Sequence, residues 1–354
     1  MKGIILHGGF GTRLRPFTYT RPKQLLPIAN VPMSQCGLNS LKNAGINDIA
    51  IIIGGENSYK VKDYYGNGEK FGVKITYVEQ DYPKGISHAI GLCQDFVDTD
   101  KFAVFLGDNI LLKDISQSVK DFEKGDEAAR ILLCEVSNPS QFGVAQLSSD
   151  GSLVKIVEKP KNPPTNLAVI GIYFLTTSIF EVIANLKPSW RNELEITDAL
   201  QVLLESKQKI SYDVITHYWK DTGTPSDIID ANKILLSQME PYFFGIREDQ
   251  VIIKGNVMVG KGTTIRKGVT IEGPVIIGEN CIIGDGAYLG PNTSIGNNCK
   301  INSCSINNSI VMDGCEISCG LKISESIISY NTTIKSNSPK NTIFTLGEDN
   351  KILL

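Results

Sequence analysis

The sequence predicts an α/β protein in which a mostly parallel sheet is followed by a parallel β-helix. Three observations lead to this prediction. The 354 residues exceed what most single cores hold, so two domains are expected. Short apolar runs alternate with longer mixed segments up to about Asn232. From about Val251, apolar residues recur at every sixth position, so the chain is expected to change its architecture between these two stretches.

Composition argues against several functional classes. A hydrophobic content of 42% and a charged content of 21% are typical of a soluble globular protein. The net charge of −3 gives no basic footprint for nucleic acid and no polybasic membrane patch. No apolar stretch reaches the roughly 20 residues of a membrane helix, and the run before Gly8 is too short for a signal peptide. Eight cysteines without a dense framework are expected to be mostly reduced, with the cytoplasm as the expected compartment.

The first part of the chain shows alternating strand and helix patterns. The expected strands are Gly3–Leu6, Ile49–Ile53, Lys74–Val78, Phe102–Leu106, Ile131–Val136 and Val169–Phe174. The expected helices are Met33–Ala44, Ser87–Phe96 and Thr197–Glu205. Continuous apolar strands that alternate with helices favour a largely parallel sheet. Such sheets bind ligands at the carboxyl ends of their strands, which is where the glycine-rich stretch after the first strand falls.

The second part carries a hexapeptide repeat. Its apolar positions are Ile253, Val259, Ile265, Ile271, Ile277, Ile283, Leu289, Ile295 and Ile301. This period fits neither an α-helix nor an ordinary strand, and it is typical of a parallel β-helix with one inward residue per repeat. The phase slips after Ile301 and resumes at Val311, which a loop or bulge near Asn307 would explain. The expected divisions are a first domain at 1–235, a connector at 236–250 and a β-helix domain at 251–354.

The stretch "LHGGFGTRLRPFTYTRPKQLLP" at residues 6–27 carries several groups suited to phosphate. It fits neither the Walker A template nor the dinucleotide fingerprint, because no Lys-Ser/Thr follows the glycines and Leu14 stands where a small residue is required. Glycine amides can approach phosphate closely, and hydroxyl, guanidinium and ammonium groups add to the site. The residues that supply these groups are Gly8, Gly9, Gly11, Thr12, Arg13 and Lys23. The alternative is an ordinary turn with solvated basic residues.

A series of motifs closely resembles the sugar-nucleotide pyrophosphorylases, or nucleotidylyltransferases. In family order they are GGFGTRL, RPKQLLPIANVPM, VFLGDNI, SQFGVAQL, IVEKP, NLAVIGIYF, NELEITDAL and YWKDTGTPSDIIDAN. The resemblance covers about residues 1–235, and a hexapeptide tail suits several members. It implies a Rossmann-like nucleotidyltransferase domain followed by a left-handed β-helix. The likeness is greatest to long forms that transfer a thymidylyl group from dTTP to glucose 1-phosphate, giving dTDP-glucose and pyrophosphate.

The resemblance also implies roles for individual residues. A sugar-phosphate oxygen would attack the α-phosphorus of the nucleotide, so catalysis depends mainly on charge neutralisation and positioning. The implied catalytic residues are Arg13, Lys23, Asp108 and Lys159. Asp108 and Asp221 would hold Mg²⁺ with phosphate oxygens and water, although an isolated Asp after a strand is more often a helix cap. The implied sugar-phosphate residues are Gly143, Glu158, Lys159, Val169 and Glu193.

The implied nucleotide-binding residues are Leu6, Gly8, Gly9, Gly11, Thr12, Gln80 and Gly85. The Gln80 amide can donate to one ring carbonyl and accept from the ring N–H, which suits thymine or uracil better than adenine. A thymine methyl adds only one apolar contact, so UTP stays an alternative to dTTP. An amino-sugar phosphate in place of glucose 1-phosphate, or a non-catalytic nucleotide-binding paralogue, are further alternatives.

Three positions depart from the family pattern. His7 stands where the family usually has Ala, His88 replaces a small residue or Gln, and Asn192 replaces Gly in R-G-E-L-E. His7 allows two interpretations, a packed neutral imidazole or a side chain that reshapes the nucleotide site. The β-helix contains no histidine for acyl transfer, so we expect it to set the oligomeric state, as a homo-oligomer, or to pack on the catalytic domain.

Overall fold

The computed structural model describes residues 1–354 except 285, 319, 321, 336–340, 343–344 and 354. Its chain forms two compact units. The sheet unit comprises Met1–Phe10 and Met33–Asp221. The β-helix unit comprises Gly11–Pro32 and Thr222–Leu354, so it includes a segment from near the N-terminus.

A mixed sheet forms the centre of the sheet unit. Its strands are β1 (Lys2–Leu6), β4 (Asp48–Ile53), β5 (Lys74–Glu79), β6 (Phe102–Leu106), β8 (Ala129–Glu135), β9 (Gly143–Leu147), β10 (Leu153–Glu158), β11 (Leu167–Leu175) and β12 (Ile210–Ile215). The order along the main path is β10-β9-β11-β6-β1-β4-β5, and β8 pairs with both β11 and β12. Strands β6, β1, β4 and β5 are parallel, which brings their carboxyl ends to one edge.

Helices cover this sheet. They are α1 (Met33–Asn43), α2 (Tyr59–Tyr65), α3 (Ile86–Gly91), α4 (Gln94–Val97), α5 (Ser116–Lys124), α6 (Ser178–Asn185) and α7 (Ile196–Glu205). Both α1 and α3 pack on β1, whose Ile4 and Ile5 are fully buried. Ile4 and Ile5 are consecutive and point to opposite faces of the sheet, so the strand is covered on both faces, as its continuous apolar sequence predicts. Burial of each such side chain contributes roughly 1.5–3 kcal/mol.

All six expected strands are present, with ends that differ by at most two residues. Two results differ in detail from the expectation. The run expected as one helix at Ser87–Phe96 is divided into α3 and α4, and α3 ends at Gly91, a residue with low helix propensity. The run at Val169–Phe174 lies within β11, which is antiparallel to β6, β8 and β9. Parallel pairing therefore holds for β6-β1-β4-β5 and for β8-β12, and the antiparallel strand β11 separates these two groups.

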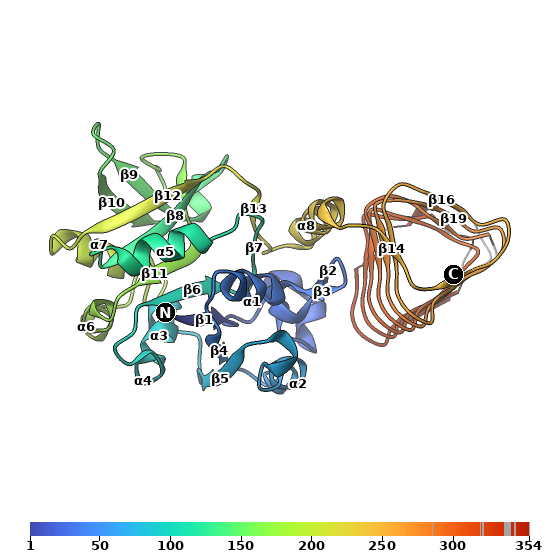
Figure 1. The fold of residues 1–354 in the computed structure, drawn as a ribbon, viewed down its shortest axis with the longest axis horizontal. Helices are drawn as coiled ribbons and strands as arrows, with labels where there is room; N and C mark the ends of the chain where they lie inside the picture. The colour runs from blue at the N-terminus through green and yellow to red at the C-terminus, as the bar shows by residue number, and fades with distance from the viewer. Residues whose placement is uncertain (285, 319, 321, 336–340, 343–344, 354) are drawn as a thin grey trace. The chain divides into compact units, whose positions relative to one another are not determined.

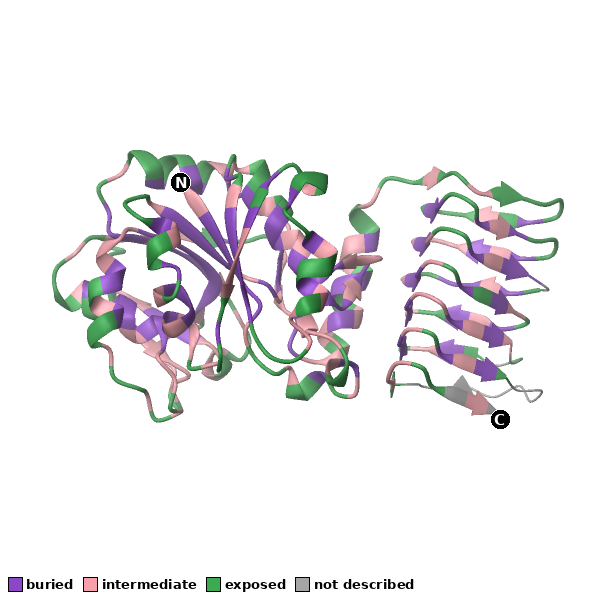
Figure 2. Ribbon diagram, turned by 90° about the horizontal axis from the view of Figure 1, so that it is seen from below, coloured by how far each residue is buried: buried purple, intermediate pink, exposed green. Residues whose placement is uncertain are grey.

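In the β-helix unit, short strands form three parallel sheets, which Figure 1 shows along the stack and Figure 2 from the side. The first sheet contains β14 (Tyr242–Phe243), β17 (Val257–Val259), β20 (Val275–Ile277), β23 (Thr293–Ile295), β26 (Ile310–Val311), β29 (Ile327–Ile328) and β32 (Thr345–Leu346). The second contains β15 (Ile246–Arg247), β18 (Thr264–Ile265), β21 (Ile282–Gly284), β24 (Lys300–Asn302), β27 (Glu316–Ser318), β30 (Thr333–Lys335) and β33 (Lys351–Leu353). The third contains β16 (Ile252–Lys254), β19 (Thr270–Glu272), β22 (Tyr288–Leu289), β25 (Ser305–Asn307), β28 (Lys322–Ser324) and β31 (Asn341–Thr342).

The hexapeptide positions form the core of this left-handed β-helix. Residues from Val259 to Ile301 in the predicted series are fully buried, and Ile253 packs against them at the first coil. The phase slip has a simple cause, because Ile301, Ile306 and Val311 are all core residues and lie five positions apart. Two turns are each one residue shorter, and Ser303 and Asn308 take left-handed backbone conformations in them. The period shortens there, and Ile306 keeps the core continuous.

The segment 11–32 joins the β-helix unit through α8 (Pro225–Gln238) and the two-stranded pair β2 (Pro27–Ile28) and β3 (Val31–Pro32). The Asn232 side chain on α8 accepts from the Ala29 N–H at 2.8 Å and from the Ser294 hydroxyl at 2.6 Å. Asn30 Nδ2 donates to the Ile295 carbonyl at 2.7 Å. Near the other end of the stack, Arg21 pairs with Glu348 at 3.0 Å. Backbone and side-chain contacts thus fasten this segment to the coils.

The connector expected at 236–250 already supplies β14 and β15, which pair with β17 and β18 of the next coil. The division of the chain at residues 235 and 250 stays a prediction. The described cysteines include buried free thiols at Cys281, Cys299 and Cys315, while Cys319 lies outside the described residues. None of the helices in the described residues has the length and apolar character needed to cross a membrane.

Candidate active site

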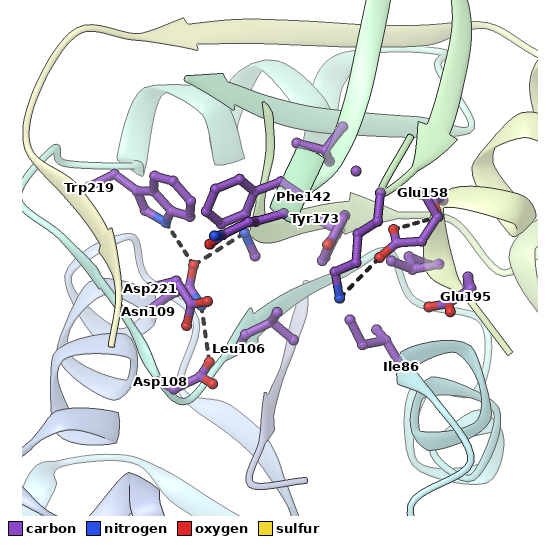
Figure 3. Close-up of a pocket in the computed structure, with 17 residues that line it drawn as sticks. Ile86, Leu106, Asp108, Asn109, Phe142, Glu158, Tyr173, Glu195, Trp219 and Asp221 are labelled. Atoms are coloured by element: carbon purple, nitrogen blue, oxygen red, sulfur yellow. Dashed lines mark hydrogen bonds and ion pairs between the residues drawn. The ribbon is translucent and has the colours of Figure 1, made fainter. Parts of the chain in front are cut away.

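A cavity of about 140 Å³ opens in the sheet unit. Figure 3 shows side chains from both halves of the sheet that converge on it. Its lining residues are Ile86, Leu106, Asp108, Asn109, Gln141, Phe142, Gly143, Glu158, Lys159, Val169, Gly171, Tyr173, Glu195, Ile196, Thr197, Trp219 and Asp221. Asp108 and Asp221 lie at one end of the cavity and Glu158 at the other (Figure 3), where Lys159 pairs with Glu158.

The acidic pair consists of Asp108 and Asp221. Asp108 follows β6 at its carboxyl end and precedes β7 (Asn109–Leu111). Asp221 ends β13 (Trp219–Asp221), which pairs with β7 in an antiparallel register that places Asp221 opposite Asn109. A short two-stranded ladder therefore brings two aspartates, more than a hundred residues apart in the sequence, to one wall of the cavity.

Asn109 holds the side chain of Asp108 in its orientation. Its side chain is only 3% exposed. Its Oδ1 accepts from the Trp219 indole N–H at 2.7 Å and from the Gly171 N–H at 3.3 Å. Its Nδ2 in turn donates to Asp108 Oδ1 at 3.0 Å, and Trp219 packs edge-on against Phe142 with ring centroids 5.4 Å apart. Because a buried amide is rigid when its hydrogen bonds are made, Asp108 is oriented by this chain of contacts.

The acidic pair suits Mg²⁺. Carboxylate oxygens are the hard ligands that this ion prefers, and it commonly keeps several waters with only one or two carboxylates. Within the described part of the chain, no group of three His, Cys, Asp or Glu side chains forms a complete metal cage. Asp108 and Asp221 could thus hold a magnesium ion whose other ligands are water and phosphate.

Glu158 and Lys159 stand at the opposite end of the cavity. Glu158 ends β10 and pairs with Gly143 of β9, which in turn pairs with Val169 of β11. The Thr197 hydroxyl donates to Glu158 Oε2 at 3.0 Å, and Lys159 Nζ lies 3.5 Å from Glu158 Oε1. Burial raises the pKa of Glu158 above its usual value, although the Lys159 charge opposes this shift.

The backbone of Lys159 is unusual for a residue with a side chain. Its φ of 40° lies in the left-handed region, and its N–H donates to the Phe142 carbonyl at 3.0 Å. Such conformations cost on the order of 1–3 kcal/mol and are common where a side chain must be aimed at a ligand. Lys159 is among the residues that line the cavity.

Arg191, which was not predicted from the sequence, contacts the cavity residue Glu158. Its guanidinium lies 3.6 Å from Glu158 Oε1, 3.2 Å from Glu195 Oε1 and 3.0 Å from Glu193 Oε1. Glu193, expected in the sugar-phosphate group, pairs with Arg191 and is not among the lining residues of the cavity. The Arg before the motif NELEITDAL was the available signal.

The backbone at Asn192 explains its departure from the family pattern. Asn192 has a φ of 60°, a conformation that Gly and Asn adopt more readily than other residues. The exchange of Gly for Asn thus keeps the turn.

The base-reading residues predicted from the sequence lie at the carboxyl edge of the parallel strands. Leu6 ends β1, Gly8 follows it, and Gln80 follows β5. A Cβ placed on Gly8 would lie 3.6 Å from Gln80 Oε1, so the two residues face each other. Gly85, with a φ of 103°, approaches Leu194 so closely that a Cβ there would meet its carbonyl at 2.5 Å. The structure therefore brings Gly8 and Gln80 together near the end of β1, and it places Gly85 against Leu194.

His7 is a packed side chain. It is buried, and its ring meets Tyr65 edge-on with centroids 6.0 Å apart. Of the two interpretations of His7, the packed imidazole is favoured by this contact. Gly9 is the next glycine along the chain, and its φ of 88° suits a residue without a Cβ.

The remaining phosphate-suited residues belong to the β-helix unit. Thr12 and Arg13 lie in a turn of 3-10 helix that follows Gly11, whose φ is 60°. A Cβ on Gly11 would lie 2.8 Å from Thr18 Cγ2 and 3.2 Å from Lys23 Cβ, so this position requires glycine. A Cβ on Gly223 would lie 3.0 Å from the Arg13 guanidinium. The loop thus folds back on itself, with Lys23 beside Gly11 and Arg13 against Gly223.

Comparison with known proteins gives a consistent result. Residues 2–238 match the nucleotidyl transferase family, and residues 271–353 match the family described as GMPPB C-terminal domain. The low-salt glycan biosynthesis nucleotidyltransferase Agl11 of Haloferax volcanii is 45% identical over 257 residues, which cover 73% of this chain and 72% of that protein. The glucose-1-phosphate thymidylyltransferase of Streptomyces antibioticus is 43% identical over 266 residues, covering 75% and 74%.

A solved structure is also similar. It is a UDP-glucose pyrophosphorylase in complex with UDP-glucose, with a TM-score of 0.62 and 28% identity. The match covers 67% of this chain and 99% of that chain.

Proposed function

Because the chain belongs to the nucleotidyl transferase family, we propose that it transfers a thymidylyl group from dTTP to glucose 1-phosphate, giving dTDP-glucose and pyrophosphate. The observation that supports this reaction best is the cavity that contains the Asp108–Asp221 pair at one end and Glu158 with Lys159 at the other. Both an activated phosphate and a sugar phosphate need such groups, and the cavity supplies them together.

In the proposed mechanism, each residue neutralises or positions a charge. The Lys159 ammonium binds the sugar phosphate, and the Glu158 carboxylate accepts hydrogen bonds from sugar hydroxyls. The phosphate oxygen is already ionised, so it attacks the α-phosphorus without a side-chain base. Asp108 and Asp221 are the proposed Mg²⁺ ligands, and a bound Mg²⁺ would lower the cost of charge that develops on the phosphates.

For the nucleotide, we propose the roles that the sequence predicts. Gly8, Gly9, Gly11 and Thr12 would donate to phosphate oxygens, and Arg13 and Lys23 would stabilise the charge on the leaving pyrophosphate. Leu6, Gln80 and Gly85 would contact the base. We keep two further proposals from the sequence, namely the homo-oligomeric state and the domain division at residues 235 and 250.

The main rival is transfer of a uridylyl group from UTP, or the use of an amino-sugar phosphate. Similarity to a UDP-glucose pyrophosphorylase favours keeping the uridylyl reaction in view. Pyrophosphate release measured across four nucleoside triphosphates and several sugar 1-phosphates separates these reactions. We expect the highest kcat/KM with dTTP and glucose 1-phosphate, and the absence of any dTTP preference would reject the thymidylyl assignment.

A non-catalytic paralogue is the rival from another class. Asp108→Ala should abolish turnover and leave the fold intact, because it removes a carboxylate at the edge of a cavity and little core volume. Asp95→Ala is a matched control, since Asp95 is exposed on α4. Unchanged turnover in Asp108→Ala would reject the metal site, and absent turnover in the unmodified protein with every substrate pair would favour the paralogue.

A further inference from the structure

A side-chain hydrogen bond links the proposed base-reading amide to a residue that departs from the family pattern. Gln80 Nε2 lies 2.8 Å from His88 Nδ1. Gln80 follows β5 and is only 5% exposed, whereas His88 lies on the first turn of α3. With Nε2 as the donor, Nδ1 must carry a lone pair, so the ring proton is on His88 Nε2.

The two ends of the Gln80 amide face different neighbours. Nε2 faces the His88 ring, and Oε1 faces Gly8 at the end of β1. The planar amide has two orientations, or settings, related by a flip of about 180° that exchanges oxygen and nitrogen. The His88 ring distinguishes these settings, since it contacts only one end.

The hydrogen bonds that the Gln80 amide can still form determine which base it matches. Gln80 Nε2 has two N–H groups, and His88 takes one, which leaves the second to donate to a ligand. Thymine and uracil present a ring N–H beside a carbonyl, which match Oε1 and the second N–H. Cytosine presents a ring nitrogen acceptor beside an amino donor, which is the reverse order. The observed setting therefore matches thymine and uracil.

We propose that the ring of His88 positions the Gln80 amide and thereby determines base specificity. The protonation state of His88 then decides whether the amide matches thymine and uracil or matches cytosine. This inference rests on the proposed function, in which Gln80 reads the base. The substrate class it names is the pyrimidine nucleoside triphosphates.

The surroundings keep His88 neutral near pH 7. Burial lowers the pKa of His88 below its usual value, and Lys84 adds to this effect while Asp81 opposes it. A protonated ring donates from both nitrogens, so Nδ1–H would then require Oε1 of Gln80 as its acceptor. The amide has to turn, and its order of acceptor and donor then matches cytosine.

The test compares nucleotides that differ only in the base. The ratio of kcat/KM for dTTP to kcat/KM for dCTP is measured as the pH is lowered through the pKa of His88. Protonation of phosphates affects both nucleotides equally and cancels. We expect the ratio to fall by up to about tenfold for each pH unit below that pKa, because the fraction of correctly set amide falls in proportion. The ratio of dTTP to dUTP should stay constant, since both bases present the same edge.

His88→Gln is the matched control, because a glutamine amide forms a hydrogen bond at this position without titrating. We expect this variant to turn over dTTP with a dTTP:dCTP ratio that does not change with pH. A wild-type ratio as flat as that of His88→Gln, with dTTP turned over normally, overturns the inference and leaves the proposed function intact. Absence of dTTP turnover in the wild type at neutral pH rejects the proposed function itself.

A second readout does not depend on activity. The chain has three histidines, so the ring nitrogens of His88 can be assigned by nitrogen NMR through the signals lost in His88→Gln. We expect Nδ1 without a proton near pH 7. A proton on Nδ1 under these conditions would contradict the hydrogen-bond direction and overturn the inference.

Discussion

The indole N–H of Trp219 offers a direct test of how the acidic pair is held. Trp219→Phe removes the donor that lies 2.7 Å from Asn109 Oδ1 and keeps an aromatic ring against Phe142. Asn109 is almost completely buried, so water cannot replace the lost donor at once. Its Oδ1 still accepts from the Gly171 N–H at 3.3 Å, which softens the loss.

The expected size follows from these contacts. A typical hydrogen bond contributes about 1 kcal/mol net, and a buried acceptor left without partners costs about 1–3 kcal/mol. Because one donor remains, we expect a loss of about 1–2 kcal/mol in the free energy of unfolding. If a similar amount is lost in the orientation of Asp108 in the transition state, kcat/KM falls by about 5- to 30-fold.

Two assays check this reasoning. Urea denaturation gives the change in the free energy of unfolding, and pyrophosphate release at varied Mg²⁺ gives kcat/KM. Trp190→Phe serves as the control, because Trp190 is 82% exposed and should change neither quantity. If Trp219→Phe matches the wild type in both assays, Asn109 does not orient Asp108 through the indole.

Other changes have equally definite outcomes. Glu158→Gln should raise Tm near pH 7, because the raised pKa of Glu158 means that its charged form destabilises the folded state as pH rises. Below about pH 4.3, the usual pKa of glutamate in an unfolded chain, Tm should not increase, and thermal scans at both pH values check this. Ile283→Ala should lower the free energy of unfolding by about 2–5 kcal/mol, as measured in urea, since Ile283 is fully buried between coils. Asn192→Ala should cost about 1 kcal/mol and Asn192→Gly nearly nothing, because only alanine opposes the left-handed turn.

The elements with the clearest local pattern in the sequence were the ones predicted correctly. Strand β6 was predicted to the residue because its five positions are all apolar and almost wholly buried. The hexapeptide core was predicted because one residue in six must face a narrow interior. Ile306 was overlooked because two short turns change the period to five, and a fixed-period search passes over it.

Long-range contacts account for what the sequence could not reveal. The family resemblance implied that Asp108 and Asp221 act together, but β7 and β13, which position them, contain three residues each, too few for a pattern. The Gln80–His88 bond joins a strand end to a helix, and no periodicity relates the two positions. Arg191 had a motif signal, but only two of its carboxylate neighbours, Glu193 and Glu195, are close to it in the sequence, and the third, Glu158, comes from the end of β10.

The membership of segment 11–32 in the β-helix unit limits how this protein can be recombined. A crossover near residue 238 that exchanged the coils for those of a relative would leave Arg21 facing a foreign residue in place of Glu348. Asn30, by contrast, uses the backbone carbonyl of Ile295 and would survive many exchanges. Chimeras of this family are therefore expected to fold stably when residues 11–32 and the coils are taken from the same parent protein, as one module made of two separate stretches of sequence.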